Sequence, residues 1–440
     1  MLPFFDIPMD VAQQGWVQVR AEERLRSGND VTATETEIQP QLRYDTIWQS
    51  GQSHFVAIYQ PRAVYTSVST TPDADFRLVN PATLSTYEED PNAPGGFRKS
   101  NPNKNPLSFL HNGGVGFEHV RRRWRLSLYQ FGAYGPVTTT ALLVQPVWNG
   151  AGIPADPNPI IPSTVAARFT LLFLQTQLFV PIRVSRRVAI IPGFVYNAFG
   201  GADSTSRAAL ALTQGPGASV AVEVAATRND RLTTTVGGGR VATAFEGDRE
   251  GATIYRAELT QAWRHWYSNH LSTELSAGGS VGGDEINGFT TFSTTQAALL
   301  YDNWNMVRLA PGAPLQGGEP GHKHHFQAAL VAKAAPWVDL FSGELEQRAV
   351  GIAAANYTID RTTLRSSVAT ARVFNTPRSV ARYSLFQAEG GLRFALTRTF
   401  SLDGGLRFGQ QSFNNAIRFN DLTQATVYAG FMYAPLPARF

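Results

Sequence analysis

A short segment near the C-terminus occurs twice and limits the possible folds more than any other feature of the chain. Residues 390–394 (GGLRF) return as residues 404–408, and only the link 397–399 separates the two surrounding segments. In the first copy Leu392 and Phe394 share one parity, while Gly391 and Arg393 share the other. Successive side chains of a β-strand point to opposite faces, so the repeat predicts two strands joined by a tight turn, each with one apolar and one polar face.

The same alternation recurs along most of the chain. It is clearest at 36–48, where Ile38, Leu42 and Trp48 oppose Glu37 and Arg43. On this pattern we expect strands at 16–25, 36–48, 54–68, 107–120, 123–135, 166–184, 188–198, 218–227, 231–245, 252–263, 271–281, 290–301, 305–309, 324–335, 339–350, 386–396, 400–408 and 423–433.

The connections between these segments alternate in length. The short breaks are 49–53, 121–123, 185–187, 228–230, 264–270, 302–304, 336–338 and 397–399, and the connections between them are mostly long. Short turns at one end and long loops at the other are typical of an outer-membrane barrel, whose short turns lie on the periplasmic side. We therefore predict an all-β fold, a transmembrane up-and-down antiparallel β-barrel of about 18 strands. A count of 16 is the alternative, because the pattern is weak at 16–25 and 305–309.

Composition and length agree with a single large barrel. No linker divides the 440 residues, so we expect a periplasmic N-terminal segment at 1–15 and one barrel domain at 16–440. No run approaches the ~18 apolar residues that a membrane helix requires. A barrel strand needs only about ten residues with every second one apolar, which average hydropathy hides. The alternative fold is a soluble β-sandwich whose apolar faces form its core.

The chain resembles the bacterial outer-membrane β-barrel proteins, a porin-like class, and the pattern covers 36–440. Its one motif is the C-terminal Phe440, which is similar to the terminal aromatic that the barrel-insertion machinery reads. Pro435 and Pro437 interrupt the last segment, so the recognised strand ends at Tyr433 in an alternative interpretation. The resemblance implies the bacterial outer membrane as location. It also implies lipid, lipopolysaccharide and the insertion machinery as partners, with a periplasmic secretion protein as a further candidate.

The polar face is where function is expected, because in a membrane barrel it lines the interior. The candidates for the inner lining are Arg43, Asp45, Arg125, Arg256, Glu258, Lys333, Glu344, Glu346, Glu389, Arg393, Asp403 and Arg407. Both signs of charge are present. They either line a solute path or pair across strands and stiffen the wall.

Three long segments, 69–105, 136–165 and 351–381, are candidates for a constriction. The last carries Arg361, Arg365, Arg372 and Arg378 with no acid after Asp360, which would attract anions. The alternative for these arginines is a solvated loop that contacts lipopolysaccharide phosphates.

The remaining motifs do not suggest catalysis. Residues 322–325 (HKHH) form the densest histidine group, but the neighbouring Gly and Pro give no converging set of metal ligands. No Ser–His spacing suggests a hydrolase, so we expect no enzyme, no metal and no cofactor, and the absence of a nucleic-acid motif predicts no nucleic-acid partner. The sequence predicts a channel for polar solute or polymer, polysaccharide export included. The alternative is a plugged barrel that acts as a surface anchor or secretion partner.

Overall fold

The computed structural model describes residues 13–28, 31–50, 52–70, 87–89, 97–99, 107–138, 168–246, 251–285, 288–303, 324–338, 343–374, 382–414 and 422–435. Its strands are β1 (Gln13–Gly28), β2 (Val31–Ser50), β3 (Ser53–Thr70), β4 (Tyr87–Glu89), β5 (Phe97–Lys99), β6 (Leu107–Val120), β7 (Arg125–Thr138), β8 (Arg168–Phe179), β9 (Ile182–Arg183), β10 (Val188–Gly201), β11 (Leu212–Ala225), β12 (Asp230–Ala244), β13 (Thr253–Trp266), β14 (Leu271–Asp284), β15 (Gly288–Asp302), β16 (His324–Val338), β17 (Leu345–Ile359), β18 (Thr362–Phe374), β19 (Arg382–Ala395), β20 (Phe400–Asn414) and β21 (Leu422–Tyr433). A single turn of helix, α1 (Ser204–Ala209), follows β10.

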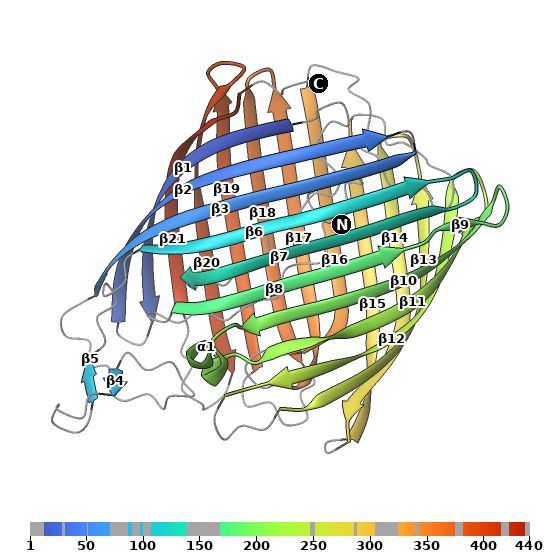
Figure 1. Ribbon diagram of the computed structural model, residues 1–440, viewed down its shortest axis with the longest axis horizontal. Coiled ribbons are helices and arrows are strands. Elements are labelled where there is room, and N and C mark those ends of the chain that lie inside the picture. Colours follow the sequence, from blue (N-terminus) through green and yellow to red (C-terminus); the bar gives the residue numbers. More distant parts are fainter. Residues whose placement is uncertain are drawn as a thin grey trace.

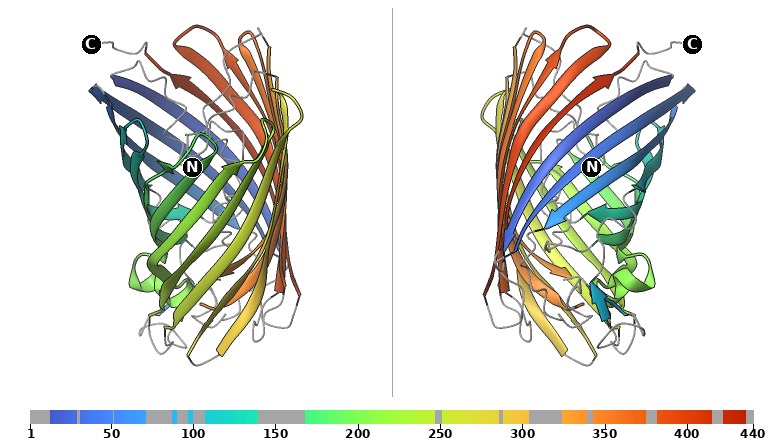
Figure 2. Two further views of the ribbon diagram at one scale, coloured as in Figure 1. Left: turned by 90° about the vertical axis from the view of Figure 1, so that its right-hand side faces the viewer. Right: turned by 90° about the vertical axis from the view of Figure 1, so that its left-hand side faces the viewer.

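These strands form one closed antiparallel barrel (Figures 1 and 2). The main sheet contains 19 strands, and β9 continues the line of β8 along β10, so the wall of the described barrel has 18 strands (19 − 1). The first and last strands pair with each other, from Val17 opposite Tyr433 to Ser27 opposite Thr423. The predicted fold class is confirmed, and the soluble sandwich is excluded because a single sheet closes on itself.

The two ends of the barrel differ in their connections. One end carries the short turns after β2, β6, β9, β11, β13, β17 and β19, together with the start of β1 and the end of β21. The opposite end carries the long connections 71–106 and 139–167 and the segment that contains α1. The pattern has exceptions, because the connection 303–323 between β15 and β16 lies at the short-turn end, and the short connections 29–30 and 285–287 lie at the opposite end.

The predicted strand at 305–309 lies outside the described residues, but it has no place between its predicted neighbours. β15 pairs directly with β16, from Thr295 opposite Ala334 to Asp302 opposite Gln327. The predicted turn at 336–338 is also wrong, because β16 continues to Val338 and β17 begins only at Leu345.

The segment 351–381 is not a long loop. It contains the second half of β17 and the whole of β18, which are joined by the two-residue turn Asp360-Arg361. Asp360 has a positive φ of 48°, which Asp adopts more readily than most residues with a side chain. One missed strand, β18, and one additional predicted strand, 305–309, therefore offset each other, and the predicted count of 18 agrees with the structure.

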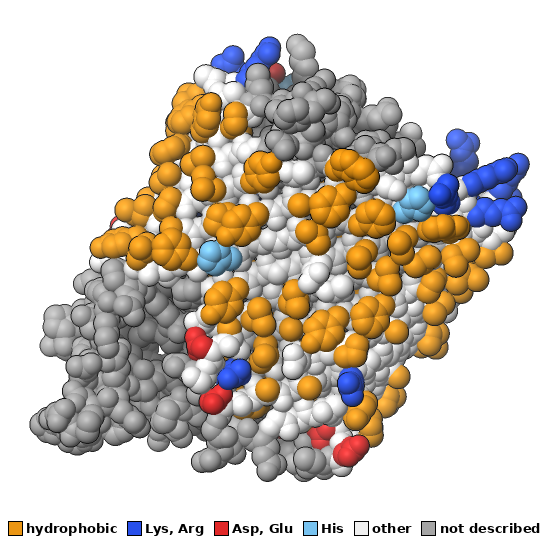
Figure 3. Space-filling model, in the orientation of Figure 1, with side chains coloured by type: hydrophobic (Ala, Val, Ile, Leu, Met, Phe, Trp, Pro, Cys, Tyr) orange, Lys and Arg blue, Asp and Glu red, His pale blue; other side chains and the backbone are white. Residues whose placement is uncertain are grey.

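The outer face of the barrel is apolar (Figure 3). Large hydrophobic side chains stay exposed on strand after strand, among them Leu42, Leu259, Leu330 and Leu406. A soluble monomer rarely exposes so large a contiguous apolar surface. Outside water, by contrast, such a surface suits contact with hydrocarbon, and the closed sheet leaves no strand edge unpaired there.

The outer apolar face yields a first prediction. Leu406 lies in the middle of β20 and is 62% exposed. If it contacts lipid, Leu406→Arg lowers the free energy of unfolding in lipid vesicles by about 2–4 kcal/mol. Leu406→Ala, which removes apolar atoms without adding charge, lowers it less. Denaturant titration followed by tryptophan fluorescence measures both values, and an arginine variant as stable as the unsubstituted protein would contradict the lipid contact.

Candidate functional site: the inner wall of the barrel

Charged and polar side chains fill the inner face of the first two strands. Along β1 the buried Glu22 and Arg24 alternate with the exposed Leu25, and along β2 the buried Glu35 and Glu37 alternate with the exposed Ile38. Because alternate residues of a strand point to opposite faces, these carboxylates and guanidinium groups lie inside the barrel. This distribution, with charged side chains inside and apolar side chains outside, is the reverse of that in a soluble protein.

Arg24 is the centre of the densest group of charges. Its guanidinium group lies 2.6 Å from a carboxylate oxygen of Glu22 and 3.5 Å from one of Glu35, and it also donates a hydrogen bond to Glu37. Each of these four residues is at most 5% exposed. A buried charge is tolerated only when it is paired and hydrogen-bonded, so each member of the group depends on the others.

The group extends along the wall in both directions. On one side Gln39 donates to Glu37, and Arg62 of β3 donates to the amide oxygen of Gln39 at 3.0 Å. On the other side Arg20 lies 2.7 Å from Glu22. The arginines Arg20, Arg24 and Arg62 balance the three carboxylates Glu22, Glu35 and Glu37.

This network also crosses the line where the barrel closes. The guanidinium carbon of Arg20 lies 3.7 Å from the ring centre of Tyr428 on β21, a cation–π contact. The Tyr428 hydroxyl donates to Glu389 of β19 at 3.3 Å, and Glu389 accepts from Arg407 of β20 at 3.1 Å. Polar side chains thus connect β3 to β19 through the pair of terminal strands. We refer to this set as the seam network.

Three further charges lie on the inner face next to the seam network. Arg393 and Asp403 are directly opposite each other on β19 and β20. Arg365 of β18 shares their face, and its charge acts on Arg393. This part of the wall therefore holds two arginines against one aspartate.

Ion pairs also cross the inner face on the far side of the barrel. Glu223 of β11 lies 2.8 Å from Arg231 of β12. Arg264 of β13 pairs with Glu274 of β14, while Arg256 and Glu258 pair along β13. Most charges of the described interior thus lie beside a charge of opposite sign, which stiffens the wall and keeps its net charge low.

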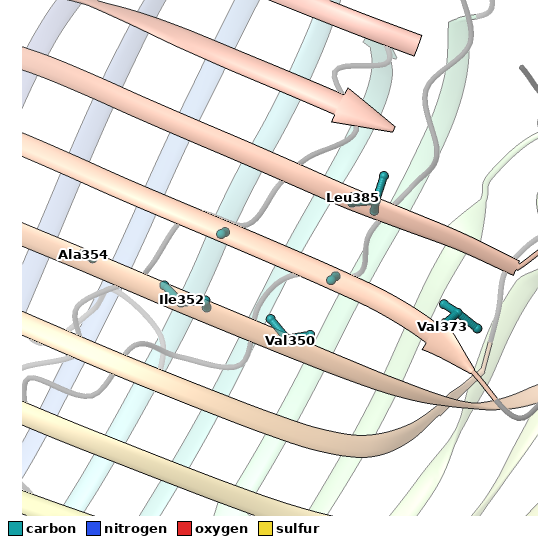
Figure 4. Close-up of a cluster of buried hydrophobic side chains, with 7 residues drawn as sticks. Val350, Ile352, Ala354, Val373 and Leu385 are labelled. Atoms are coloured by element: carbon teal, nitrogen blue, oxygen red, sulfur yellow. The ribbon is translucent and has the colours of Figure 1, made fainter. Parts of the chain in front are cut away.

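The inner wall also carries two apolar areas. One is a buried cluster on β17, β18 and β19, of which Val350, Ile352 and Leu385 are members (Figure 4). The other is a row of rings from Phe131 on β7 through Phe173 on β8 to Phe199 on β10, with ring centres 5.6 and 6.1 Å apart. The interior is therefore mixed rather than uniformly polar.

The structure places the predicted inner-face residues as follows. Arg43, Arg125, Arg256, Glu258, Lys333, Glu389, Arg393, Asp403 and Arg407 lie on the face opposite the exposed apolar side chains, Glu346 is buried on that face of β17, and Glu344 lies just before β17. The side chain of Asp45 is outside the described residues. The structure brings Glu389 to Arg407, Arg256 to Glu258 and Arg393 opposite Asp403, but it does not bring the set together at one site.

The predicted loop constriction is corrected by the β17–β18 hairpin. Arg361 lies in a short turn, Arg365 faces inward from β18, and Arg372 shares the outer face with Leu364 and Val368. Arg378 lies outside the described residues, as do Phe440 and the greater part of the segments 69–105 and 136–165. Three of the four arginines therefore belong to the barrel wall and its rim rather than to one loop.

Sequence reasoning missed most of the seam network. Arg20, Glu22 and Arg24 are spaced two residues apart, which places them on one face of a strand. Glu35 shares the inner face of β2 with Glu37. The predicted strand began only at residue 36, whereas β2 begins at Val31, so Glu35 was placed outside the strand. Charged residues two positions apart occur both before and after the short connection 29–30, and this pattern could have indicated a hairpin with charges of opposite sign on one face.

The described residues contain no group of three or more His, Asp or Glu side chains that could hold a metal ion. His324 stacks on Tyr357, and His325 lies 2.9 Å from Asp302, so these two histidines of the 322–325 group already have partners.

Within the part of the chain that the structure describes, no helix has the length and apolar character needed to cross a membrane.

Comparison with known proteins gives structural likeness only. No family model matches the chain, and no curated protein matches it. Among solved structures, it is similar to OccAB2 of Acinetobacter baumannii, with 8% identity, a TM-score of 0.42 and coverage of 99% of this chain and 100% of that one. It is also similar to OpdK of Pseudomonas aeruginosa, solved with vanillate, with 11% identity, a TM-score of 0.41 and coverage of 96% and 99%. Superpositions this loose add nothing to the fold that the strand pairing itself establishes.

The Arg24 group yields a second prediction. Arg24→Ala leaves three buried carboxylates without their shared partner, so it lowers the free energy of unfolding by about 3–5 kcal/mol. Adding Glu37→Gln recovers part of that loss, because one stranded charge is removed. The control Arg398→Ala, at an exposed turn, costs less than about 0.5 kcal/mol. Equal costs for Arg24→Ala and Arg398→Ala would show that the group does not hold the wall.

Proposed function

We propose that the protein is an outer-membrane channel through which small polar solutes pass. The observation that carries the proposal is the inverted polarity of an 18-strand barrel, with large apolar side chains exposed on its outer face and ionised side chains inside. Ionised side chains are expensive in hydrocarbon, so they face the interior, and the exposure of Arg365 on the inner face of β18 indicates that water reaches it there. A barrel of 16–18 strands is wide enough to leave an aqueous path unless other segments fill it.

The chemistry of the described inner wall favours small charged or polar solutes over a polymer. The seam network consists of paired charges of both signs. Beside it, Arg365 on β18 and Arg393 on β19 add positive charge to the inner wall. Polysaccharide export, which the sequence alone left open, gains no support from the comparisons. A plugged barrel that serves as an anchor is the competing function, and only conductance distinguishes it from a channel.

The third prediction tests the channel directly. Purified, folded protein in planar lipid bilayers gives stepwise current increments. The plugged-barrel function predicts folded protein that inserts and carries no current.

Two arginines on one strand provide a matched pair for ion selectivity. Arg365 faces the interior and Arg372 faces outward, and both are exposed on β18. Arg365→Gln raises the permeability of cations relative to anions by about twofold. One charge about 8 Å from the ion path in water acts on a cation and an anion by about 0.5 kcal/mol each with opposite signs, and screening over a Debye length of about 8 Å reduces each value to about 0.2 kcal/mol. Arg372→Gln leaves the ratio unchanged. Reversal potentials in a salt gradient measure both ratios, and equal effects would contradict the assignment of inner and outer faces.

A further inference from the structure

The turns at one end of the barrel share a construction that the channel proposal does not use. In four of them a hydroxyl oxygen accepts backbone N–H groups two and three residues ahead. The donors are Arg187 and Val188 to Ser185 at 3.1 and 3.1 Å, Asn229 and Asp230 to Thr227 at 3.0 and 3.0 Å, His270 and Leu271 to Ser268 at 3.0 and 3.1 Å, and Thr399 and Phe400 to Thr397 at 3.2 and 3.0 Å. These bonds fix the turn backbone and therefore the direction of the residue that follows the hydroxyl.

That residue is arginine in three of the four turns. Arg186, Arg228 and Arg398 follow the hydroxyl residue, and Asn269 takes the place in the fourth turn. The two-residue turn after β17 presents Arg361, and the turn after β6 presents three consecutive arginines at 121–123. All of these arginines are exposed. We call the set of turns 121–124, 184–187, 226–229, 267–270, 360–361 and 396–399 the arginine rim.

Acidic side chains do not neutralise the rim in its described turns. The Asp230 carboxylate already accepts hydrogen bonds from the Thr227 hydroxyl and from the Trp263 indole N–H at 3.0 Å. It also lies 2.8 Å from Nδ1 of His265. Arg361, next to Asp360, donates to the Leu396 carbonyl at 3.3 Å, and Arg121 donates to His119 at 2.9 Å, so neither bonds to a carboxylate. In the described turns no ion pair joins a rim arginine to an acid of its own turn, and the positive charge of the rim therefore faces solvent or a partner.

The rim adjoins exposed apolar and aromatic side chains of the outer face. Two arginine turns are tied together by a hydrogen bond from the Arg183 N–H to the Arg123 carbonyl at 2.7 Å, and Trp124 pairs with Ile182 beside them. Trp124, Val184 and Tyr433 are all exposed at this end. Figure 3 shows the basic side chains of one such group at the tip of the barrel, next to the hydrophobic surface. Aromatic side chains next to cationic ones are typical of the level of lipid headgroups.

We propose that the arginine rim binds the phosphate groups of anionic phospholipids in the leaflet on the short-turn side. Arginine matches phosphate oxygens with two parallel donors, and the rim presents such donors from hairpins that are spread along the sheet from β6 to β20. A lipid leaflet surrounds a barrel, whereas a protein partner docks on one side. The distribution therefore favours lipid, and it rests on the membrane placement made under the proposed function.

The fifth prediction compares two pairs of arginines. Arg186→Gln with Arg398→Gln removes two rim charges from different hairpins. Arg240→Gln with Arg372→Gln removes two exposed charges from the outer face nearer the opposite end. Native mass spectrometry of the folded protein in detergent, titrated with equal phosphatidylglycerol and phosphatidylcholine, counts the lipids that stay bound.

The unsubstituted protein prefers phosphatidylglycerol by about fivefold, which corresponds to one arginine near a membrane surface. The rim pair reduces that preference at least by half, and the control pair leaves it unchanged. A folded protein that inserts into vesicles but binds both lipids equally overturns the inference and makes an acidic protein the better occupant. The inference is also overturned if the rim pair and the control pair of substitutions reduce the preference for phosphatidylglycerol equally. A protein that does not insert into vesicles overturns the membrane placement instead.

Discussion

The pairing of the first strand with the last is the interaction on which the rest of the structure depends. In hydrocarbon every backbone N–H and C=O group must find its partner within the protein, and an open sheet leaves one row unpaired at each edge. Here β1 and β21 pair over the stretch from Val17 to Ser27, so the sheet has no edge. Closure gives every strand an inside and an outside, and the alternation of side chains then distributes them between lipid and interior.

The same closing line is where the charged side chains are most concentrated. Arg20 contacts Glu22 on its own strand and Tyr428 on the last strand, and Tyr428 reaches Glu389. These contacts link side chains across a junction whose two strands are separated by almost the whole chain. A wall built from paired charges is rigid and nearly neutral. The excess positive charge of Arg365 and Arg393 over Asp403 would therefore have more influence on ions in the proposed channel.

The sequence predicted the fold wherever the two faces of a strand differ in polarity. The repeat at 390–394 and 404–408 forms β19 and β20, with Leu392 and Leu406 outside and Arg393 and Arg407 inside. The strand prediction failed where the two faces of a strand do not differ in polarity. On β17 the buried Val350, Ile352 and Ala354 face inward while Ala and Gly occupy outer positions 349–355, and on β18 the inner Ala369, Ala371 and Val373 oppose outer Thr, Ser and Arg. The usual alternation of apolar outside and polar inside is therefore lost on both strands. The turn between them contains no Gly, and nothing local indicated a hairpin.

The candidate site was less predictable than the fold for a physical reason. Alternation says which face a charge occupies, and this was enough to place Glu389, Arg393 and Arg407 on the inner face. It does not give the register between strands, which decides that Arg24 meets Glu35 and Glu37 rather than neighbouring groups. Nor does it predict the row from Phe131 to Phe199, because residues 171–174 of β8 are apolar on both faces.

The central claim is that water meets one face of each strand and lipid the other, and the chain offers a direct measurement because it contains no cysteine. Single cysteines introduced as Leu402→Cys, Asp403→Cys, Leu406→Cys and Arg407→Cys sample both faces of β20. In lipid vesicles a water-soluble thiol reagent should modify the cysteines at 403 and 407 and leave those at 402 and 406 unmodified. Equal modification at all four positions, or modification at 402 and 406 alone, would contradict the account.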